Sequence, residues 1–404
     1  MFHNYDLQID IYDPKKVIIL IYRHMVQAVS IKNVSKNDKS LEIEWNDGEK
    51  SNFHFMWLRD NCPYGVHPTA RQRSFNLLTV SNNIHPKTYS ITQDGKLEIK
   101  WSEGEHTSHF DPLWLRNHCY TINNKKPYTS PYVLWDARLK DDMGKVTVEC
   151  EEVMNSDEGL IKWMEQLHHY GFSLLHNAPT EKKSALKILH RISHIRETFF
   201  GTPFDVINIP KPNNTAYTSL GLRNHSDLPY YEYMPGYQFL HCLVNDAKGG
   251  LSLVIDGFHV AKYLKENDPS AFEILAKTHV KFKDNDYTQN KIRIFHSPMI
   301  KLTKDNDFSE IRFSVATMAA MDCPPNEMEK FYFAYKKFAK LVHDDEFAVK
   351  FRIKAGDILS FDNRRILHGR TEFDPNSGLR HLQGYYSDRD EILSRLNYLK
   401  KIEI

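Results

Sequence analysis

The sequence of 404 residues has few cysteines, no long apolar run and no excess of charge of either sign. Its cysteines are scattered and odd in number, which fits free thiols in a reducing compartment better than a disulfide framework. The longest apolar run near the start, VIILIY, is far too short to span a bilayer, and no small-residue cleavage site follows it. These absences predict a cytoplasmic protein without a membrane partner or a secretory signal.

The charges nearly cancel, with 53 Lys and Arg against 52 Asp and Glu. A chain without a basic excess offers no electrostatic footprint for nucleic acid or for an anionic membrane surface, so neither is expected as a partner. A glycine-rich phosphate loop after a strand is also missing, which disfavours a doubly wound α/β fold. The length permits a substantial buried core, arranged as one large domain or as two.

A duplication occupies the amino-terminal part of the chain. LEIEWNDGEKSNFHFMWLRDNC at 41–62 returns as LEIKWSEGEHTSHFDPLWLRNHC at 97–119. Each copy alternates apolar and polar residues, turns at Asn-Asp-Gly or Ser-Glu-Gly and then reaches Trp-Leu-Arg, which is typical of a hairpin followed by a turn. We predict a small β-rich domain at 26–130, preceded by an extension at 1–25 that falls outside the repeat.

The remaining residues, 131–404, follow a polar stretch that contains prolines. Their apolar periodicity predicts helices at 156–169, 180–200 and 325–342. The other segments are mostly short strands, such as YQFLHCLV and DILSFDN, separated by loops. The expected fold class is therefore mainly β with α, a β-sandwich or jelly roll under helical cover.

Three side chains form a candidate metal site. His225 and Asp227 make a His-x-Asp pair, and His368 lies far downstream in FDNRRILHGR. Two histidines and one carboxylate are the ligands of non-haem Fe(II) oxygenases, which leave positions open on one face of the metal for an oxoacid and O2. A jelly roll can bring the close pair and the distant histidine together from opposite sheets. A lone His-x-Asp pair usually lies on the surface or in the core and has no metal role. Here His368 and then Arg380 follow it in the sequence, and the Arg380 guanidinium suits a carboxylate such as that of 2-oxoglutarate.

Several longer segments resemble a known family. NNTAYTSLGLRNHSDLPYY, FDNRRILHGR and RHLQGYYSDRDEILSRL look like the γ-butyrobetaine dioxygenase and trimethyllysine dioxygenase family, and FMWLRDNCP is similar to its small amino-terminal domain. The resemblance implies a double-stranded β-helix domain with Fe(II) held by His225, Asp227 and His368. These enzymes are of the taurine-dioxygenase type and are commonly homodimers, so a homodimer is expected.

The same resemblance assigns the cosubstrate. It implies that Arg380 anchors 2-oxoglutarate and that Asn214 and Ser252 lie in or near the cosubstrate pocket. O2 is then the co-reactant, and ascorbate is a candidate reductant. The acidic residue usual in the family before the position of Ser252 is Leu251 here.

The implied substrate is a small trimethylammonium compound of the γ-butyrobetaine type, hydroxylated at an aliphatic C–H bond as in carnitine biosynthesis. A quaternary ammonium has no N–H to donate, so a protein holds it by packing aromatic faces around its charge. The family's aromatic cage matches Phe200, Phe204, Tyr217 and Tyr386, and Tyr230 can compensate where phenylalanine stands. The plainer alternative is that these aromatics are core.

The family's Asn-Asn pair, which helps to bind the polar end of the substrate, is replaced here by Ser314 and Val315. A free carboxylate buried without donors would cost several kcal/mol, on the order of 2–7. The alternatives are therefore a hydroxylase of trimethyllysine, of a trimethylammonium phosphonate or of another small amine. A non-catalytic binding module of the same fold is the alternative from a different class, which the intact metal ligands argue against.

The family's amino-terminal domain often binds zinc. In this chain Cys62 remains from the cysteine set, with His67 and His106 as candidate partners. A structural zinc site usually needs four Cys or His ligands, so zinc is the less favoured reading. Cys62 and Cys119 occupy equivalent places in the duplication, which favours packing after the Trp-Leu-Arg turn.

Overall fold

The computed structural model describes residues 29–121, 130–209, 217–287 and 289–401. Contacts within the chain divide it into two compact units, Met1–Tyr128 and Thr129–Ile404. None of the helices in the described residues has both the length and the hydropathy to cross a membrane. The predicted extension at 1–25 lies outside the described residues.

The amino-terminal unit repeats one supersecondary element. Each repeat is a three-stranded antiparallel sheet followed by a short helix. The first repeat comprises β1 (Ile31–Lys36), β2 (Ser40–Trp45), β3 (Lys50–His54) and α2 (Phe55–Asp60). The second comprises β4 (Pro86–Ile91), β5 (Leu97–Trp101), β6 (Thr107–Phe110) and α3 (Pro112–Asn117), and the 3-10 turns η1 (Pro63–Gly65) and η2 (Leu77–Thr79) lie between the two.

Equivalent buried side chains hold the two repeats in the same way. The indole N–H of Trp45 donates to the hydroxyl of Ser51 at 2.7 Å, and that of Trp101 donates to Ser108 at 2.8 Å. Each bond satisfies a polar atom of a fully buried ring, which would otherwise be costly to bury. The duplication in the sequence therefore corresponds to duplicated packing, with Trp-Leu-Arg in a short helix.

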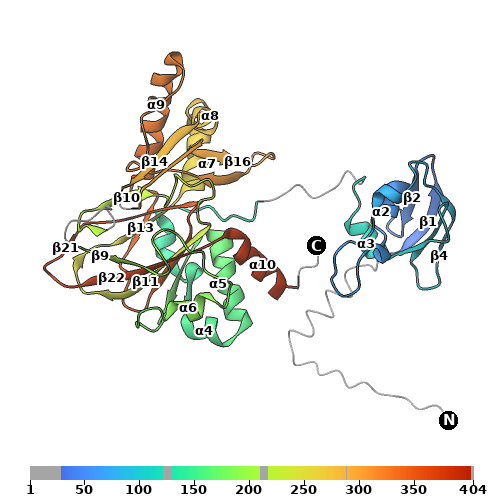
Figure 1. Ribbon diagram of the computed structural model, residues 1–404, viewed down its shortest axis with the longest axis horizontal. Coiled ribbons are helices and arrows are strands. Elements are labelled where there is room, and N and C mark those ends of the chain that lie inside the picture. Colours follow the sequence, from blue (N-terminus) through green and yellow to red (C-terminus); the bar gives the residue numbers. More distant parts are fainter. Residues whose placement is uncertain (1–28, 122–129, 210–216, 288, 402–404) are drawn as a thin grey trace, which may run out of the picture. The chain divides into compact units, whose positions relative to one another are not determined.

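The carboxy-terminal unit is built on two sheets (Figure 1). The six-stranded sheet has the order β7 (Thr147–Glu149), β8 (Phe172–His176), β19 (Ile358–Asp362), β11 (Tyr237–Asn245), β22 (Arg380–Ser387), β9 (Phe204–Ile207). The four-stranded sheet has the order β10 (Leu222–His225), β20 (Ile366–Arg370), β13 (Ser252–Asp256), β18 (Ala348–Phe351). Only β7 and β8 of these neighbouring pairs run parallel. The expected jelly-roll fold with helical cover is confirmed.

Smaller strand pairs extend this unit. They are β12 (Lys248–Gly249) with β21 (Phe373–Asp374), β14 (Val280–Asp286) with β15 (Lys291–Ser297), and β16 (Ile300–Leu302) with β17 (Phe308–Ile311). The β14–β15 hairpin contributes Asp284 to the candidate active site.

Alternation along the strands divides the core into two layers. In β19, Ile358 packs with the helices, whereas Leu359 and Phe361 belong to a second cluster that also contains Val254 of the four-stranded sheet. Successive side chains of a strand point to opposite faces, so one face meets helices and the other meets the facing sheet. The apolar core between the sheets borders the cavity, because Leu359 and Leu382 belong to both.

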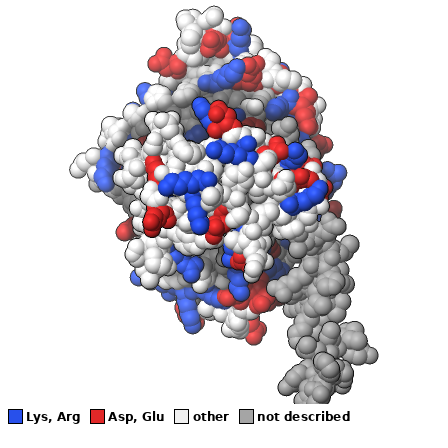
Figure 2. All heavy atoms as spheres, turned by 90° about the vertical axis from the view of Figure 1, so that its right-hand side faces the viewer, with Lys and Arg blue, Asp and Glu red and all other residues white. Residues whose placement is uncertain are grey.

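Helices cover the sheets in two groups (Figure 1). The first group packs on the six-stranded sheet and comprises α4 (Cys150–Asn155), α5 (Asp157–Tyr170), α6 (Ala185–Leu189) and α10 (Arg389–Leu399). The second group comprises α7 (Gly257–Asn267), α8 (Pro269–Lys277) and α9 (Pro325–Val342), and the 3-10 segment η3 (Ala137–Val146) precedes β7. On the face shown in Figure 2, basic and acidic side chains are interspersed, as the balanced composition predicts.

Two of the three predicted helices are confirmed, at 156–169 and 325–342, where α5 and α9 lie. The helix predicted at 180–200 is wrong, because only Ala185–Leu189 is α-helical. The backbone N–H of Arg196 instead donates to the carbonyl of Tyr386 at 2.9 Å, so this segment runs beside β22. Tertiary pairing overrides the helical periodicity there.

Candidate active site

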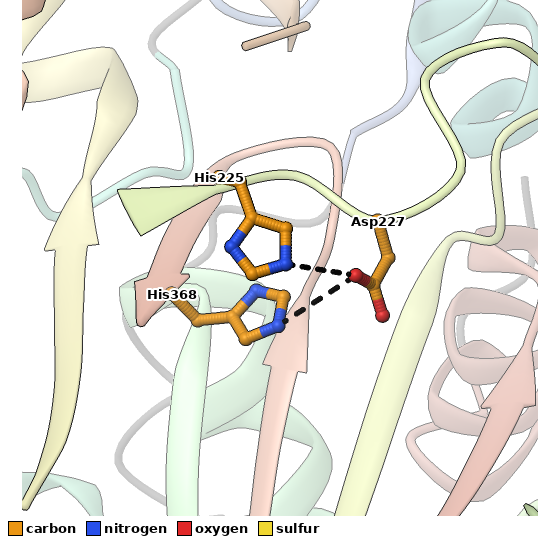
Figure 3. Close-up of side chains that lie close together, drawn as sticks. All are labelled: His225, Asp227 and His368. Atoms are coloured by element: carbon orange, nitrogen blue, oxygen red, sulfur yellow. Dashed lines mark hydrogen bonds and ion pairs between the residues drawn. The ribbon is translucent and has the colours of Figure 1, made fainter. Parts of the chain in front are cut away.

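The two histidines of the candidate metal site lie side by side on neighbouring strands (Figure 3). β10 and β20 pair antiparallel with His225 opposite His368, and the ring centroids are 4.3 Å apart. Both strands belong to the four-stranded sheet, so the prediction that the ligands come from opposite sheets is wrong. The backbone ladder itself sets the spacing of the two imidazoles.

Asp227 faces both histidines from the loop after β10. Its Oδ1 lies 3.1 Å from Nε2 of His225 and 3.8 Å from Nε2 of His368. The loop is fixed by Asn363, whose Oδ1 accepts from the backbone N–H of Asp227 at 2.7 Å and whose Nδ2 donates to its carbonyl at 3.0 Å. Across the described residues, His225, Asp227 and His368 are the one group of three or more metal-binding side chains that converge, with ligand atoms within 4.8 Å of one another.

The tautomer of His225 and the neutral state of His368 are those that metal ligands need. Nδ1 of His225 lies 2.9 Å from the carbonyl of Arg223, so it carries the proton and leaves Nε2 to face Asp227. Burial and the positive charge of His225 lower the pKa of His368 to about 3, which keeps this imidazole neutral, as a ligand must be. Two imidazole nitrogens and a carboxylate oxygen on one side of a point are the donor set of a non-haem iron centre.

Electrostatics also favour a cation between the three ligands. Burial raises the pKa of Asp227, but its hydrogen bonds to His225 and Tyr386 and its electrostatic interactions with the two imidazoles lower it more, so the carboxylate stays ionised. Burial lowers the pKa of His225, and the bond to Asp227 reverses this and raises it overall. A metal ion would take the place of the proton shared by these two residues.

Arg380 reaches the same cavity from the six-stranded sheet. It begins β22 and is only 7% exposed, and its Nε has no hydrogen-bond partner among the described residues. No carboxylate of the described residues pairs with Arg380, so its buried guanidinium could bind an anionic ligand. Burial, and then the positive charge of Arg370, lower the pKa of Arg380 to about 10.

Gly250, between β12 and β13, leaves space for the side chain of Arg380. Gly250 has a φ of +67°, and a Cβ at this position would lie 3.3 Å from Nε of Arg380. Ser252 follows in β13, where it is buried and pairs in register with Arg370. Ser252 and Arg380 both line the cavity, whose volume is about 500 Å³.

The expected cage residues lie in the wall of this cavity, and we call them the aromatic cluster: Phe200, Phe204, Tyr217, Tyr230 and Tyr386. The rings of Phe204 and Tyr386 stack with centroids 5.1 Å apart, and Phe200 lies 5.5 Å from Phe204. Gly384 of β22 permits this arrangement, because a Cβ there would collide with the ring of Phe204. The hydroxyl of Tyr386 donates to Oδ2 of Asp227 at 2.7 Å, which joins the aromatic cluster to the metal ligands.

The cavity wall also contains the segment in which Ser314 and Val315 replace the Asn-Asn pair of the family. Ser314, Val315, Ala316 and Thr317 line the cavity, and the hydroxyl of Thr317 is buried without a partner among the described residues. This wall therefore offers hydroxyl groups and small side chains to a ligand. Asn214 lies outside the described residues.

Three charged residues of the cavity, Arg223, Asp284 and Arg370, were not predicted from the sequence. Arg223 stands two positions before His225 in β10, where the register of the strand shifts, so strand alternation alone does not place it at the cavity. Asp284 comes from the β14–β15 hairpin, which no local motif connects to the metal ligands.

The candidate zinc residues of the amino-terminal unit come together only in part. Sγ of Cys62 lies 3.3 Å from Nε2 of His106. His67 does not join them within the described residues, and its Nδ1 accepts from the backbone N–H of Ala70 at 3.1 Å. Two ligands fall short of the four that a structural zinc site uses, so this donor set does not fit zinc. Cys62 and Cys119 are both buried, at 3% and 4% exposure.

Comparison with known proteins gives consistent relatives for both units. The family model described as Taurine catabolism dioxygenase TauD, TfdA family matches residues 135–386, and that described as Gamma-butyrobetaine hydroxylase-like, N-terminal matches residues 32–116. The chain is 37% identical to gamma-butyrobetaine dioxygenase of Pseudomonas sp. (strain AK-1) over 365 residues, which cover 89% of this chain and 94% of that protein.

Two further relatives have similar coverage. Gamma-butyrobetaine dioxygenase of Homo sapiens is 32% identical over 372 residues, which cover 89% of this chain and 94% of that protein. Trimethyllysine dioxygenase of Meyerozyma guilliermondii is 29% identical over 389 residues, which cover 91% and 96%. With its paired histidines, carboxylate and buried arginine in one cavity, the chain belongs to the TauD, TfdA family of dioxygenases, in the group that contains the gamma-butyrobetaine and trimethyllysine dioxygenases.

Proposed function

We propose that this dioxygenase uses Fe(II), 2-oxoglutarate and O2 to hydroxylate an aliphatic C–H bond of a small trimethylammonium compound of the γ-butyrobetaine type. The observation that carries the proposal is a single cavity lined by His225, Asp227, His368, Arg380 and the aromatic cluster. Relatives named gamma-butyrobetaine dioxygenase support the substrate class.

His225, Asp227 and His368 would hold the iron, and Arg380 would bind the distal carboxylate of 2-oxoglutarate through its two-pronged guanidinium. Bound iron with 2-oxoglutarate supplies the activated oxygen for C–H hydroxylation, and 2-oxoglutarate leaves as succinate and CO2. Ser252 and Asn214 belong to the same proposed cosubstrate pocket. The protein's own contribution is to hold the substrate in one orientation and to exclude water from the reacting atoms.

The aromatic cluster would receive the trimethylammonium group. Its ring faces attract a diffuse cation that cannot accept or donate a hydrogen bond, and a contact of this kind is worth about 0.5–2 kcal/mol. Tyr386 belongs to the aromatic cluster, and its hydroxyl donates to Asp227. A trimethylammonium compound bound at the cluster would therefore lie beside the metal ligands. That placement selects a C–H bond a short distance from the cation.

The polar end of the substrate faces a different wall from the one the family pattern predicts. Ser314 and Thr317 offer hydroxyl groups, and Arg223 offers a positive charge at the same cavity. This set can hold a carboxylate or a phosphonate, so trimethyllysine and trimethylammonium phosphonates are the second candidate substrates. The relative named trimethyllysine dioxygenase favours the former.

The wider setting forms part of the proposal. We place the enzyme in the cytoplasm, as a homodimer in a carnitine-forming sequence of reactions, with ascorbate as a reductant. The five free cysteines support a reducing compartment.

The test is a screen for substrate-stimulated release of succinate. Purified protein with Fe(II) and 2-oxoglutarate is offered γ-butyrobetaine, trimethyllysine and trimethylammonium phosphonates, and the products are identified by mass. We expect at least one trimethylammonium compound to stimulate succinate release and to gain one oxygen atom. The variants His225→Ala and Asp227→Ala should lose succinate formation, while the exposed His194→Ala should keep it. Turnover that survives in His225→Ala would remove the iron assignment, and a non-catalytic binding module would show no turnover in any variant.

A further inference from the structure

The β14–β15 hairpin brings a carboxylate to the wall of the cavity. Asp284 of β14 pairs in register with Arg293 of β15, and its Oδ2 accepts from Nη1 of Arg293 at 2.9 Å. Asp284 lines the cavity together with Phe200 and Tyr230 of the aromatic cluster. The carboxylate is thus held in place by a partner while it borders the space where a ligand binds.

The surroundings of this pair carry a net negative charge. Arg293 also lies 3.7 Å from Oδ2 of Asp286, so two carboxylates share one guanidinium. Its guanidinium is fixed over the ring of Phe199, 3.9 Å from the centroid, and the Arg293 side chain is 12% exposed. Arg293 partly offsets the charge of Asp284, but it is shared with Asp286 and held against Phe199, so the carboxylate and not the guanidinium borders the cavity.

The charge of Asp284 acts on the aromatic cluster. Burial raises the pKa of the Tyr230 phenol most, the negative charges of Asp284 and then Asp227 raise it further, and the positive charge of Arg293 opposes them with a smaller effect. Tyr230 therefore lies within the field of both carboxylates, one belonging to the metal site and one to the hairpin. A cation at the aromatic cluster would be attracted by Asp284, whereas a bound metal ion would neutralise Asp227.

We infer that Asp284 is a specificity-determining residue, which supplies a negative charge that selects a trimethylammonium group over an uncharged group of the same shape. The inference rests on the proposed function and names the part of the site that recognises charge. Aromatic faces alone also accept neutral alkyl groups, since much of their attraction is apolar burial. A carboxylate in the wall discriminates, because it attracts a quaternary ammonium without needing a hydrogen bond and gives nothing to a neutral carbon group.

The test compares the binding of two ligands of equal shape. Choline carries a trimethylammonium group, and 3,3-dimethylbutan-1-ol carries a tert-butyl group in its place. Their dissociation constants are measured by calorimetry with the iron- and 2-oxoglutarate-loaded protein under nitrogen. We expect choline to bind more tightly to the wild type, and Asp284→Asn to reduce that preference by about tenfold. Asp286→Asn is the matched control, because it removes the same charge from the same arginine at a position outside the cavity wall, and it should keep the preference.

A double variant tests whether the effect of Asp284→Asn comes from the lost carboxylate or from misfolding around an unpaired Arg293. Asp284→Asn with Arg293→Gln removes both partners, so no uncompensated buried cation remains, and it should show the same loss of preference. Unchanged preference in both variants, or no preference in the wild type, would overturn the role of Asp284. Failure of the proposed function would appear separately, as a lack of succinate release with every trimethylammonium compound in the screen.

Discussion

The hydroxyl of Tyr386 donates a hydrogen bond of 2.7 Å to Oδ2 of Asp227, while Oδ1 of the same carboxylate faces His225 and His368. One side chain of the six-stranded sheet thus orients a ligand that lies beside the four-stranded sheet. It leaves one carboxylate oxygen for a metal ion and occupies the other. This phenol therefore links the six-stranded sheet to the metal ligands, in addition to the apolar packing between the sheets.

We predict that Tyr386→Phe weakens iron binding by about tenfold, because partners that orient a metal ligand typically contribute 10–100-fold to affinity. The ring remains, so the stacking on Phe204 is kept and the substrate should lose little affinity. Iron titration followed by spectroscopy measures the first effect, and the KM for substrate measures the second. Tyr385→Phe is the control, since its hydroxyl contacts Gln383 instead; equal iron affinities in both variants would contradict the prediction.

We predict that Arg380→Lys raises the KM for 2-oxoglutarate by at least about tenfold and that Arg380→Ala raises it further. Lysine keeps the charge but loses the planar fork that matches a carboxylate, and alanine loses both. Losing one partner of a buried charged hydrogen bond costs about 2–5 kcal/mol. Initial rates at varied 2-oxoglutarate give the constants. An unchanged KM in Arg380→Ala would move the cosubstrate anchor elsewhere.

Two glycines that pack against side chains of the cavity wall allow a paired experiment. Gly384→Ala should displace Phe204 and so raise the KM for substrate, whereas Gly250→Ala should crowd Arg380 and raise the KM for 2-oxoglutarate. Both variants lose stability, on the order of 1–3 kcal/mol for overpacking. The comparison of the two KM values is the readout, with thermal unfolding as a check on folding. The assignment of the two ends of the cavity fails if the effects are exchanged.

His168, at the end of α5, should make the protein less stable in acid. Burial, and then the positive charge of His169, lower its pKa from 6.5 to about 4, so the unfolded chain binds a proton more readily than the folded one. The stabilisation is complete above pH 6.5 and is lost as the pH falls towards 4. The Tm, measured across this range, should fall less steeply in His168→Gln than in the wild type. Parallel curves for the two proteins would exclude His168 as a contributor.

The jelly-roll fold and the residues that gather in the cavity could be predicted because short motifs carry them. His225, Asp227, His368 and Arg380 lie in segments with a recognisable order, and the structure brings them to one cavity. Their sheet of origin could not be predicted, since strand order depends on pairings between residues far apart in the sequence.

Other features depended on tertiary contacts that leave no local signal. The periodicity at 180–200 indicates a helix, yet the hydrogen bond of Arg196 to Tyr386 draws the chain into an extended path. Asp284 lines the cavity together with the aromatic cluster because the fold brings the β14–β15 hairpin to the cavity wall. Sequence patterns report local preference, and such contacts are settled by global packing.

The pairing of His225 with His368 has a consequence for evolution and engineering. The ladder between β10 and β20 fixes the distance between the imidazoles, so the parts of the intervening chain that lie outside the two sheets and outside the Asp227 and Asn363 loops can vary in length and content. Insertions in the hairpins and helices of that stretch would reshape the ligand-facing wall without moving the histidines. By contrast, a single residue inserted within either strand would turn one imidazole to the opposite side. New substrates are therefore most readily sought by exchanging elements such as the β14–β15 hairpin, while the strands of the two sheets and the loops of Asp227 and Asn363 are left unchanged.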